Sequence, residues 1–130
     1  MSLLILIAVH SRNSFIGLLF VLEIKPTILR DIEPTINATK GEPMTLSIEA
    51  TGNPKPTVRF FRGAEELLAT EGQIEMKESE DGQTFSMTIL SVQPNQQGDY
   101  TAAAQNTGGV AKSKKCKVTV TSKSSFYSKF

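Results

Sequence analysis

The sequence predicts an all-β domain built as a sandwich or a barrel. Apolar and polar residues alternate along residues 44–50, 84–89 and 100–104, which is typical of strands with one buried and one exposed face. Turn residues recur at intervals of about ten after Lys25, the spacing expected for short strands in such folds. No segment after Lys25 sustains the period of an amphipathic helix, so a helical fold is not expected.

Length and composition restrict the classes of function. A chain of 130 residues holds one domain with a single core. Its net charge of +1 supplies no strong field for nucleic acid or for an acidic membrane. Cys116 is the only cysteine, so no disulfide forms within the chain and a reducing compartment is favoured. With one histidine and one cysteine, the chain holds no ordinary zinc site.

Residues 1–24 form an apolar segment whose status the sequence leaves open. Two apolar runs, 3–9 and 15–22, flank a polar stretch that contains His10 and Arg12. An arginine near the centre of a membrane helix costs about 2.5 to 3.5 kcal/mol, which disfavours a spanning helix. A signal peptide would need positive residues before its apolar centre and a small-residue cleavage site, and neither stands out. A targeting segment, an extension that is ordered or disordered, and a stretch not native to the domain remain open.

Three strands are expected in the first half of the domain. Residues 26–29 are predicted to form an edge strand, because the proline at its start has no N–H for a neighbouring strand, and residues 34–39 continue it. Residues 44–50 form the most regular strand, between turns at 40–43 and 51–56. Val58 and Phe60 alternate with Arg59 and Phe61, which predicts the third strand.

Two hairpins are expected in the second half. Residues 66–69 form either a short edge strand or a helical turn. Residues 73–77 and 84–89 flank Asp81-Gly82, a strong hairpin signal, so that acidic residues occupy the tip. The strand containing Tyr100 is followed by Asn106-Thr107-Gly108-Gly109, which turns the chain into a last strand ending at residues 117–120.

The alternation also predicts a core that is large enough for one domain. Burial of each larger apolar side chain is worth roughly 1.5 to 3 kcal/mol, so the whole set contributes some tens of kcal/mol against chain entropy. The predicted inward residues are Leu46, Ile48, Val58, Phe60, Ile74, Phe85, Met87, Ile89, Tyr100, Ala102, Cys116, Val118 and Val120.

Four stretches together resemble the immunoglobulin superfamily, specifically its I-set domains, over residues 25–121. They are Gly41-Glu42-Pro43-Met44-Thr45-Leu46, residues 52–58, residues 85–92, and Gly98-Asp99-Tyr100 with residues 104–109. The resemblance implies an immunoglobulin-like β-sandwich of two antiparallel sheets with Greek-key connections. It also implies that Tyr100 forms the tyrosine corner, with its hydroxyl bonded to backbone in the preceding connection.

Departures from the family pattern indicate the compartment. Ile48 and Ala102 occupy the two core-cysteine positions, Phe60 occupies the tryptophan position, and Gln96 replaces a frequent aspartate. A disulfide between the first two positions would add roughly 4 kcal/mol to the free energy of unfolding. Burial of the isoleucine side chain supplies part of this stability in its place. Domains without this bridge look most like those of the giant intracellular muscle proteins, the titin, twitchin and obscurin group.

No catalytic or cofactor site is expected. The only histidine lies in the segment of uncertain status, so no serine, cysteine or lysine nucleophile can be paired with it in the domain. Cys116 shares the parity of Val118 and Val120, so it is interpreted as a small buried hydrophobe rather than a reactive thiol. The sequence therefore predicts no enzyme, no metal and no small-molecule substrate.

Two groups of charged residues are the candidate interaction surfaces. Lys112, Lys114, Lys115 and Lys117 concentrate positive charge near the last strand, and Glu78, Glu80 and Asp81 concentrate negative charge on the hairpin tip. Solvated faces are the alternative interpretation of both groups. The expected partners are other proteins or neighbouring domains of the same chain, reached by electrostatic complementarity.

The resemblance implies a non-catalytic structural and protein-interaction module of an intracellular muscle or cytoskeletal protein, with a cytoplasmic, sarcomeric location. The alternative is a secreted or membrane-anchored adhesion or recognition domain, for which the apolar N-terminus and the sequon Asn37-Ala38-Thr39 speak. The polar stretch 122–130 is interpreted as a tail or linker, and a neighbouring kinase domain is left open.

Overall fold

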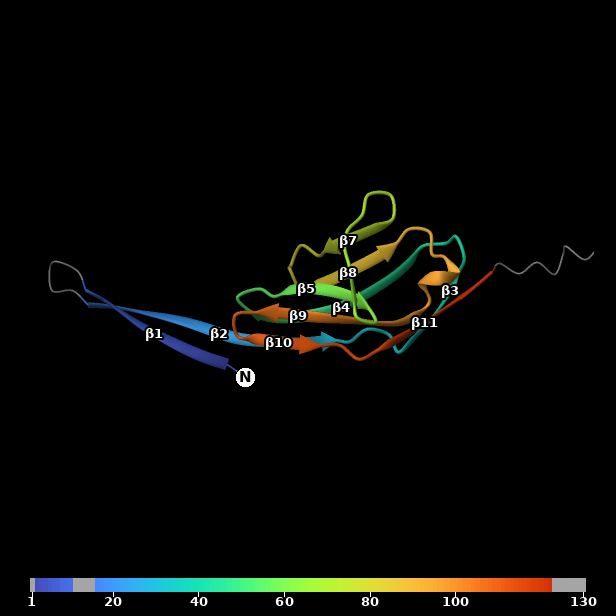
Figure 1. Cartoon of the computed structure of the whole chain (residues 1–130). Helices are drawn as coiled ribbons and strands as arrows, with labels where there is room; N and C mark the ends of the chain where they lie inside the picture. Colours follow the sequence, from blue (N-terminus) through green and yellow to red (C-terminus); the bar gives the residue numbers. More distant parts are fainter. Residues whose placement is uncertain (1, 11–15, 123–130) are drawn as a thin grey trace, which may run out of the picture.

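Two packed β-sheets make up the fold (Figure 1). The computed structural model describes the backbone of residues 2–10 and 16–122, and the side chains of residues 22–122. A single turn of 3₁₀-helix, η1 (Pro94–Gln96), interrupts the strands of this part. The strands are β1 (Ser2–His10), β2 (Ile16–Arg30), β3 (Thr35–Thr39), β4 (Met44–Asn53), β5 (Thr57–Arg62), β6 (Glu65–Leu67), β7 (Ile74–Glu78), β8 (Thr84–Ile89), β9 (Gly98–Asn106), β10 (Gly109–Lys112) and β11 (Cys116–Thr121).

The strand order confirms the predicted sandwich. One sheet has the order β1-β2-β4-β8-β7, and the other has the order β3-β11-β9-β5-β6 with β10 also paired to β9. Neighbours in each sheet are mostly distant in sequence, as Greek-key connections require. All pairs are antiparallel except β3 and β11, which run parallel from Lys117 opposite Thr35 to Thr121 opposite Thr39.

The first strand of the domain begins earlier than predicted. The sequence places its start at Pro26, whereas β2 begins at Ile16 and passes through the proline without ending. The ladder with β4 tolerates the proline because its register shifts between Ile24 and Thr27. Asn53 pairs with Ile24, so β4 also extends through residues 51–53, which the sequence assigns to a turn.

The N-terminal segment forms a two-stranded ribbon in the described backbone. β1 pairs antiparallel with the first part of β2, from Ser2 opposite Ile24 to His10 opposite Ile16. Figure 1 shows this ribbon projecting from one end of the sandwich. The side chains of His10 and Arg12 and the whole stretch 123–130 lie outside the described residues. Within that description, no helix is long and apolar enough to cross a membrane.

The last strand is broken in two at Ser113. The Ser113 N–H donates to the carbonyl oxygen of Ala102 at 2.8 Å, and its hydroxyl oxygen accepts the Ala102 N–H at 2.8 Å. At this position, therefore, a side-chain hydroxyl takes the place of a backbone carbonyl in the hydrogen bonding with β9. Beyond it the chain continues as β11, which pairs with β9 at Cys116 opposite Tyr100 and with β3 on its other side.

The core lies between the inner faces of the two sheets. The predicted inward residues are buried, except that Val58 and Ile74 are partly buried and pack against the core. The core extends beyond the predicted set in two ways: Met44, Ala50 and Ala104 continue the buried parity of β4 and β9, and Ile32 and Val92 lie in connections, where alternation gives no signal. These additional buried residues are Ile32, Ala38, Met44, Ala50, Leu67, Val92 and Ala104.

Tyr100 connects the core to the turn before β9. Its ring is completely buried, and its hydroxyl donates to the carbonyl oxygen of Gln96, the contact that a tyrosine corner implies. The Gln96 side-chain oxygen accepts the Gln93 N–H at 2.7 Å. The side chain of Gln96 therefore caps the start of η1, and its backbone carbonyl holds the Tyr100 hydroxyl.

Asn106 joins three segments at the end of the sandwich next to the ribbon. Its Nδ2 donates to the carbonyl oxygens of Ile24 at 2.7 Å and Pro54 at 2.9 Å, while its Oδ1 accepts the Gly108 N–H at 2.7 Å. The segments come very close here: a Cβ on Gly52 would lie 3.0 Å from the asparagine Nδ2 and 3.1 Å from the Ile24 carbonyl oxygen. A side chain at residue 52 would therefore push these segments apart by a few tenths of an ångström.

Asn106→Ala is expected to lower the free energy of unfolding by about 1 to 3 kcal/mol, because it removes the partner of three backbone groups, and two of these bonds are partly buried. Urea denaturation of the variant measures the loss. Asn95→Ala is the matched control, since Asn95 is exposed in η1, and a change within about 0.5 kcal/mol is expected there. Equal losses in the two variants would contradict the anchoring role of Asn106.

Candidate interaction surfaces

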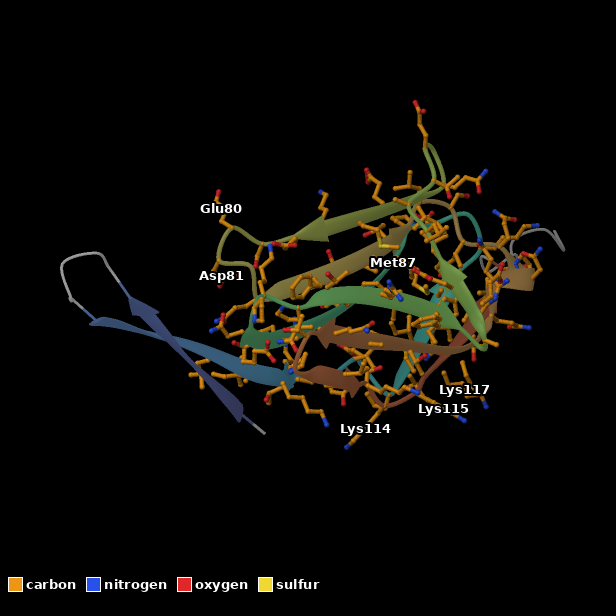
Figure 2. The ribbon with its side chains drawn as sticks, turned by 60° about the vertical axis from the view of Figure 1, so that its left-hand side comes forward. Glu80, Asp81, Met87, Lys114, Lys115 and Lys117 are labelled. Carbon is orange, nitrogen blue, oxygen red and sulfur yellow. The ribbon has the colours of Figure 1, made fainter. Side chains whose placement is uncertain are left out.

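Four lysines form what we call the basic strip: Lys112, Lys114, Lys115 and Lys117. Lys112 ends β10, Lys114 and Lys115 lie in the connection after it, and Lys117 lies in β11. All four are exposed. The chain breaks at Ser113 between the first lysine and the other three, and Figure 2 shows the last three side by side.

Backbone contacts hold the basic strip in place, while its ammonium groups stay in solvent. The Lys114 N–H donates to the Asp31 carboxylate at 3.2 and 3.3 Å, and the Lys117 N–H donates to the Pro34 carbonyl oxygen at 2.9 Å. No carboxylate lies within 4.0 Å of the four ammonium groups in the part of the chain that the structure describes. Asp99 is opposite Lys117 in the ladder and moderates the local charge.

The acidic hairpin tip, which consists of Glu78, Glu80 and Asp81, is largely occupied by its own contacts. Glu78 forms an ion pair with Lys55, from the connection between β4 and β5. The Asp81 carboxylate accepts bonds from the Ser79 hydroxyl and from the Gln83 N–H at 3.0 Å. These two bonds, the serine first, lower the pKa of Asp81.

The two charged surfaces lie apart and differ in their freedom to bind. In Figure 2 the hairpin tip, marked by Glu80 and Asp81, is on the opposite side of the molecule from the basic strip. Among the tip carboxylates, Glu78 is paired with Lys55 and Asp81 is bonded within the hairpin, whereas the lysine ammonium groups have no ion-pair partner among the described residues. The basic strip is therefore the stronger candidate for an electrostatic contact.

A groove of about 630 Å³ opens between the edge strands of the two sheets, and no pattern in the sequence indicates it. Its apolar lining includes the exposed Leu68 and Met76 and the buried Leu67 and Phe85. We call it the edge groove. Met76 lies opposite the buried Met87 and shares the inward parity of Ile74, but it stays 36% exposed.

Phe60, Ile48 and Ala102 occupy the centre of the sandwich. Phe60 lies directly opposite Ala102 in the ladder of β5 and β9. Ile48 lies on β4 in the other sheet, and β4 approaches β9 to within 8 Å between Cα atoms. Their exposed fractions are 0% for Ile48, 1% for Ala102 and 2% for Phe60, so apolar packing fills the position at which the family resemblance implies a disulfide.

Cys116 is buried in β11, facing the core. Burial, followed by the nearby negative charge of Glu33, raises the pKa of its thiol to about 11. The thiolate is the reactive form, so both access and ionisation are unfavourable. Among the described residues no three histidine, cysteine, aspartate or glutamate side chains are arranged to hold a metal ion.

The Cys116 thiol is expected to react with a disulfide reagent such as dithionitrobenzoate only when the protein unfolds. A pKa of about 11 leaves about one thiol in a thousand ionised at pH 8. Absorbance during labelling should therefore show negligible reaction in native buffer and one thiol per chain in guanidinium chloride. Native labelling at the rate of a free thiol would mean that β11 is not packed as described.

Comparisons with known proteins agree with this geometry. The family model of the immunoglobulin I-set domain matches residues 26–120. Titin of Drosophila melanogaster is 33% identical over 86 residues, which are 66% of this chain and, to the nearest per cent, 0% of that protein. Fast-type myosin-binding protein C of Mus musculus is 32% identical over 75 residues, which are 58% of this chain and 6% of that protein. The chain thus spans a small part of each relative.

A solved structure supports the same fold. One chain of the crystal structure of the complex between titin M10 and an obscurin-like 1 immunoglobulin domain matches with a TM-score of 0.70 and 24% identity. The match covers 78% of this chain and 99% of the other. With the sheet order, the tyrosine corner and a family model that spans most of the sequence, the chain belongs to the immunoglobulin I-set family.

Proposed function

We propose that this chain is one immunoglobulin module of a larger intracellular muscle protein, in which it is a non-catalytic spacer that binds other proteins. The observation that carries the proposal is the packing at the position of the family disulfide. Ile48 and Ala102 are buried there and Cys116 is a protonated core residue, so stability comes from apolar burial without an oxidised bridge. A protein that never meets an oxidising compartment has to be stable without a disulfide, and this packing meets that condition.

The similarity to muscle proteins supports the location that we propose. The relatives include titin and a myosin-binding protein, and the matched structure contains an immunoglobulin domain in complex with a titin domain. These similarities fit a position in the sarcomere. There the module would contact other proteins or neighbouring domains of the same chain. The basic strip is the surface that we assign to such contacts, because its lysines lack ion-pair partners among the described residues.

The domain organisation that we propose has the I-set domain at residues 25–121, a polar tail or linker at 122–130, and the apolar segment at 1–24. The family match to residues 26–120 and a core that runs from Ile32 to Val120 support the central part. β2 crosses Lys25 without a break, so the first boundary lies within a strand.

Antibody staining of striated muscle from the organism that encodes the chain tests the intracellular location. An antibody against this chain should stain permeabilised fibres in a regular striped pattern and leave intact fibres unstained. Staining of intact fibres would overturn the proposal.

The second candidate, a secreted or membrane-anchored recognition domain, is favoured by one observation. Asn37 of the sequon is exposed on β3, and its neighbour Ala38 points into the core. A glycan at this asparagine is therefore sterically accommodated. Treatment of the native protein with peptide N-glycosidase distinguishes the candidates, since a mass decrease would show passage through the secretory pathway and would contradict the intracellular proposal.

A further inference from the structure

We infer that the ribbon of β1 and β2 is a reserve of length: it opens when the two ends of the chain are pulled apart and releases about 70 Å before the sandwich unfolds. The ribbon lies before residue 26, where the family match begins, so the family fold alone does not include this property. A spacer between other domains carries tension, so this role rests on the function proposed above.

The ribbon is held together by a single ladder. β1 ends its sheet and pairs with β2 alone in the described backbone, from Ser2 opposite Ile24 to His10 opposite Ile16. Figure 1 shows the ribbon projecting beyond the end of the sandwich. Two strands without a third strand or a packed layer are only marginally stable in water. The ribbon is therefore expected to open under a smaller force than the sandwich.

The strand order decides how tension reaches the ribbon. Ser2 and Ile24 face each other at the end of the ribbon that lies next to the sandwich. Tension on the chain ends pulls these two residues apart, because Ser2 is on the N-terminal side and Ile24 leads into the sandwich. The pairs then carry the force one after another, from Ser2 toward His10. A ladder loaded in this way opens pair by pair.

The sandwich is loaded differently. The chain enters it along β2 at the ribbon end and leaves it along β11 at the opposite end (Figure 1). Tension therefore acts along the direction of β2, and the pairs of its ladder with β4, from Ile24 opposite Asn53 to Arg30 opposite Glu49, share the force. Breaking several pairs together requires a greater force than opening single pairs in sequence.

Opening of the ribbon stops where β2 becomes attached to the sandwich. The Leu22 carbonyl oxygen accepts a bond from Asn53 Nδ2 at 2.5 Å, and the Ile24 carbonyl oxygen accepts one from Asn106 Nδ2 at 2.7 Å. Pro26, two residues further on, is buried. These contacts fix β2 to β4 and β9, so the length that can be released is that of the chain between Ser2 and Ile24.

The size of the extension follows from the register. The 22 peptide units from Ser2 to Ile24 span about 75 Å when they are extended at about 3.4 Å each. In the closed ribbon the Cα atoms of the two residues lie about 5 Å apart across the ladder. Opening therefore lengthens the chain by about 70 Å.

Single-molecule stretching of the full chain, with handles attached to its two ends, tests the inference. The first step should lengthen the chain by about 70 Å, at a lower force than unfolding of the sandwich. Release of the tension should close the ribbon, because the sandwich still holds β2 in place, so the step should reappear in the next pull.

Leu4→Cys combined with Leu22→Cys should make the step depend on oxidation. The two positions are opposite each other in the ladder, so an oxidant should crosslink them and remove the step, and a reductant should restore it. Leu4→Cys with Phe20→Cys is the matched control. Phe20 is opposite Leu6, which puts it diagonally about 7 to 8 Å from residue 4 and out of disulfide range, so this pair should keep the step in the oxidant.

Four results would overturn the inference: no step before the sandwich unfolds, a first step much longer than 70 Å, a step that persists in the crosslinked Leu4 and Leu22 variant, or failure of that variant to crosslink. The second would show that the sandwich opens first, and the last that the ribbon is not paired as described. The stretching experiment concerns this chain alone, whereas the staining experiment locates it in the cell. Failure here is therefore distinguishable from failure of the proposed function.

Discussion

Ile48→Ala is expected to lower the free energy of unfolding by about 2 to 5 kcal/mol. The side chain is completely buried on β4, and its removal leaves a cavity at the centre of the sandwich in addition to the lost apolar burial. Phe60 and Tyr100 nearby are also buried, and close packing restricts their collapse into the space. Urea denaturation followed by circular dichroism measures the change.

Leu29→Ala provides the control for this prediction. Leu29 is 55% exposed, so the same kind of truncation there should change the free energy of unfolding by less than about 0.5 kcal/mol. A loss below about 1 kcal/mol for the Ile48 variant would mean that β4 is placed incorrectly in the core.

Combining Ile48→Cys with Ala102→Cys is expected to give a protein that forms a disulfide on oxidation. Both positions are buried on inner faces, and their strands approach within 8 Å between Cα atoms, near the range that a disulfide spans. Closing the long loop between them should stabilise the oxidised form over the reduced form by roughly 4 kcal/mol. Non-reducing electrophoresis detects the crosslink, and denaturation of both forms measures the gain.

The matched pair for this experiment is Leu46→Cys with Ala102→Cys. Leu46 is also buried on β4 but lies two residues along the strand, about 7 Å away, which puts its side chain out of disulfide range. A crosslink in the Leu46 pair and none in the Ile48 pair would show that the two sheets face each other in a different register.

Alternation predicted the strands of the central domain well, because a half-buried strand leaves a pattern in its own sequence. The strands at 44–50, 84–89 and 100–104 lie within β4, β8 and β9. Residues 66–69, left open between a strand and a helical turn, belong to β6 only at Glu66 and Leu67. Three residues are too few for any periodic signal.

Features that depend on two distant segments were beyond prediction. The path of β2 through Pro26 depends on its ladder with β4, and the corner at Asn106 joins groups 82 residues apart. The break at Ser113 depends on a bond to β9 across the sheet. The sequence predicts a turn at Asn106-Thr107-Gly108-Gly109, but it does not show that Asn106 bonds to Ile24 and Pro54.

The candidate interaction surfaces were likewise predictable only in part from the sequence. The sequence identified the lysines of the basic strip and the carboxylates of the hairpin tip, but it could not tell that Glu78 is paired with Lys55. Nor could it indicate the edge groove, because Met76 and Leu68 look like ordinary apolar residues until the end of β6 is known.

The all-β class, the I-set resemblance and the absence of an intrachain disulfide follow from the residues alone. Each of these depends on residue identity and local spacing, which no later contact changes. Contacts between distant strands are needed to tell which described charges lack an ion pair and which strands lie at the edges of the two sheets. The burial of a side chain and the formation of an ion pair both depend on a second segment that packs against the first. That second segment lies far away in the sequence, so local spacing does not identify it.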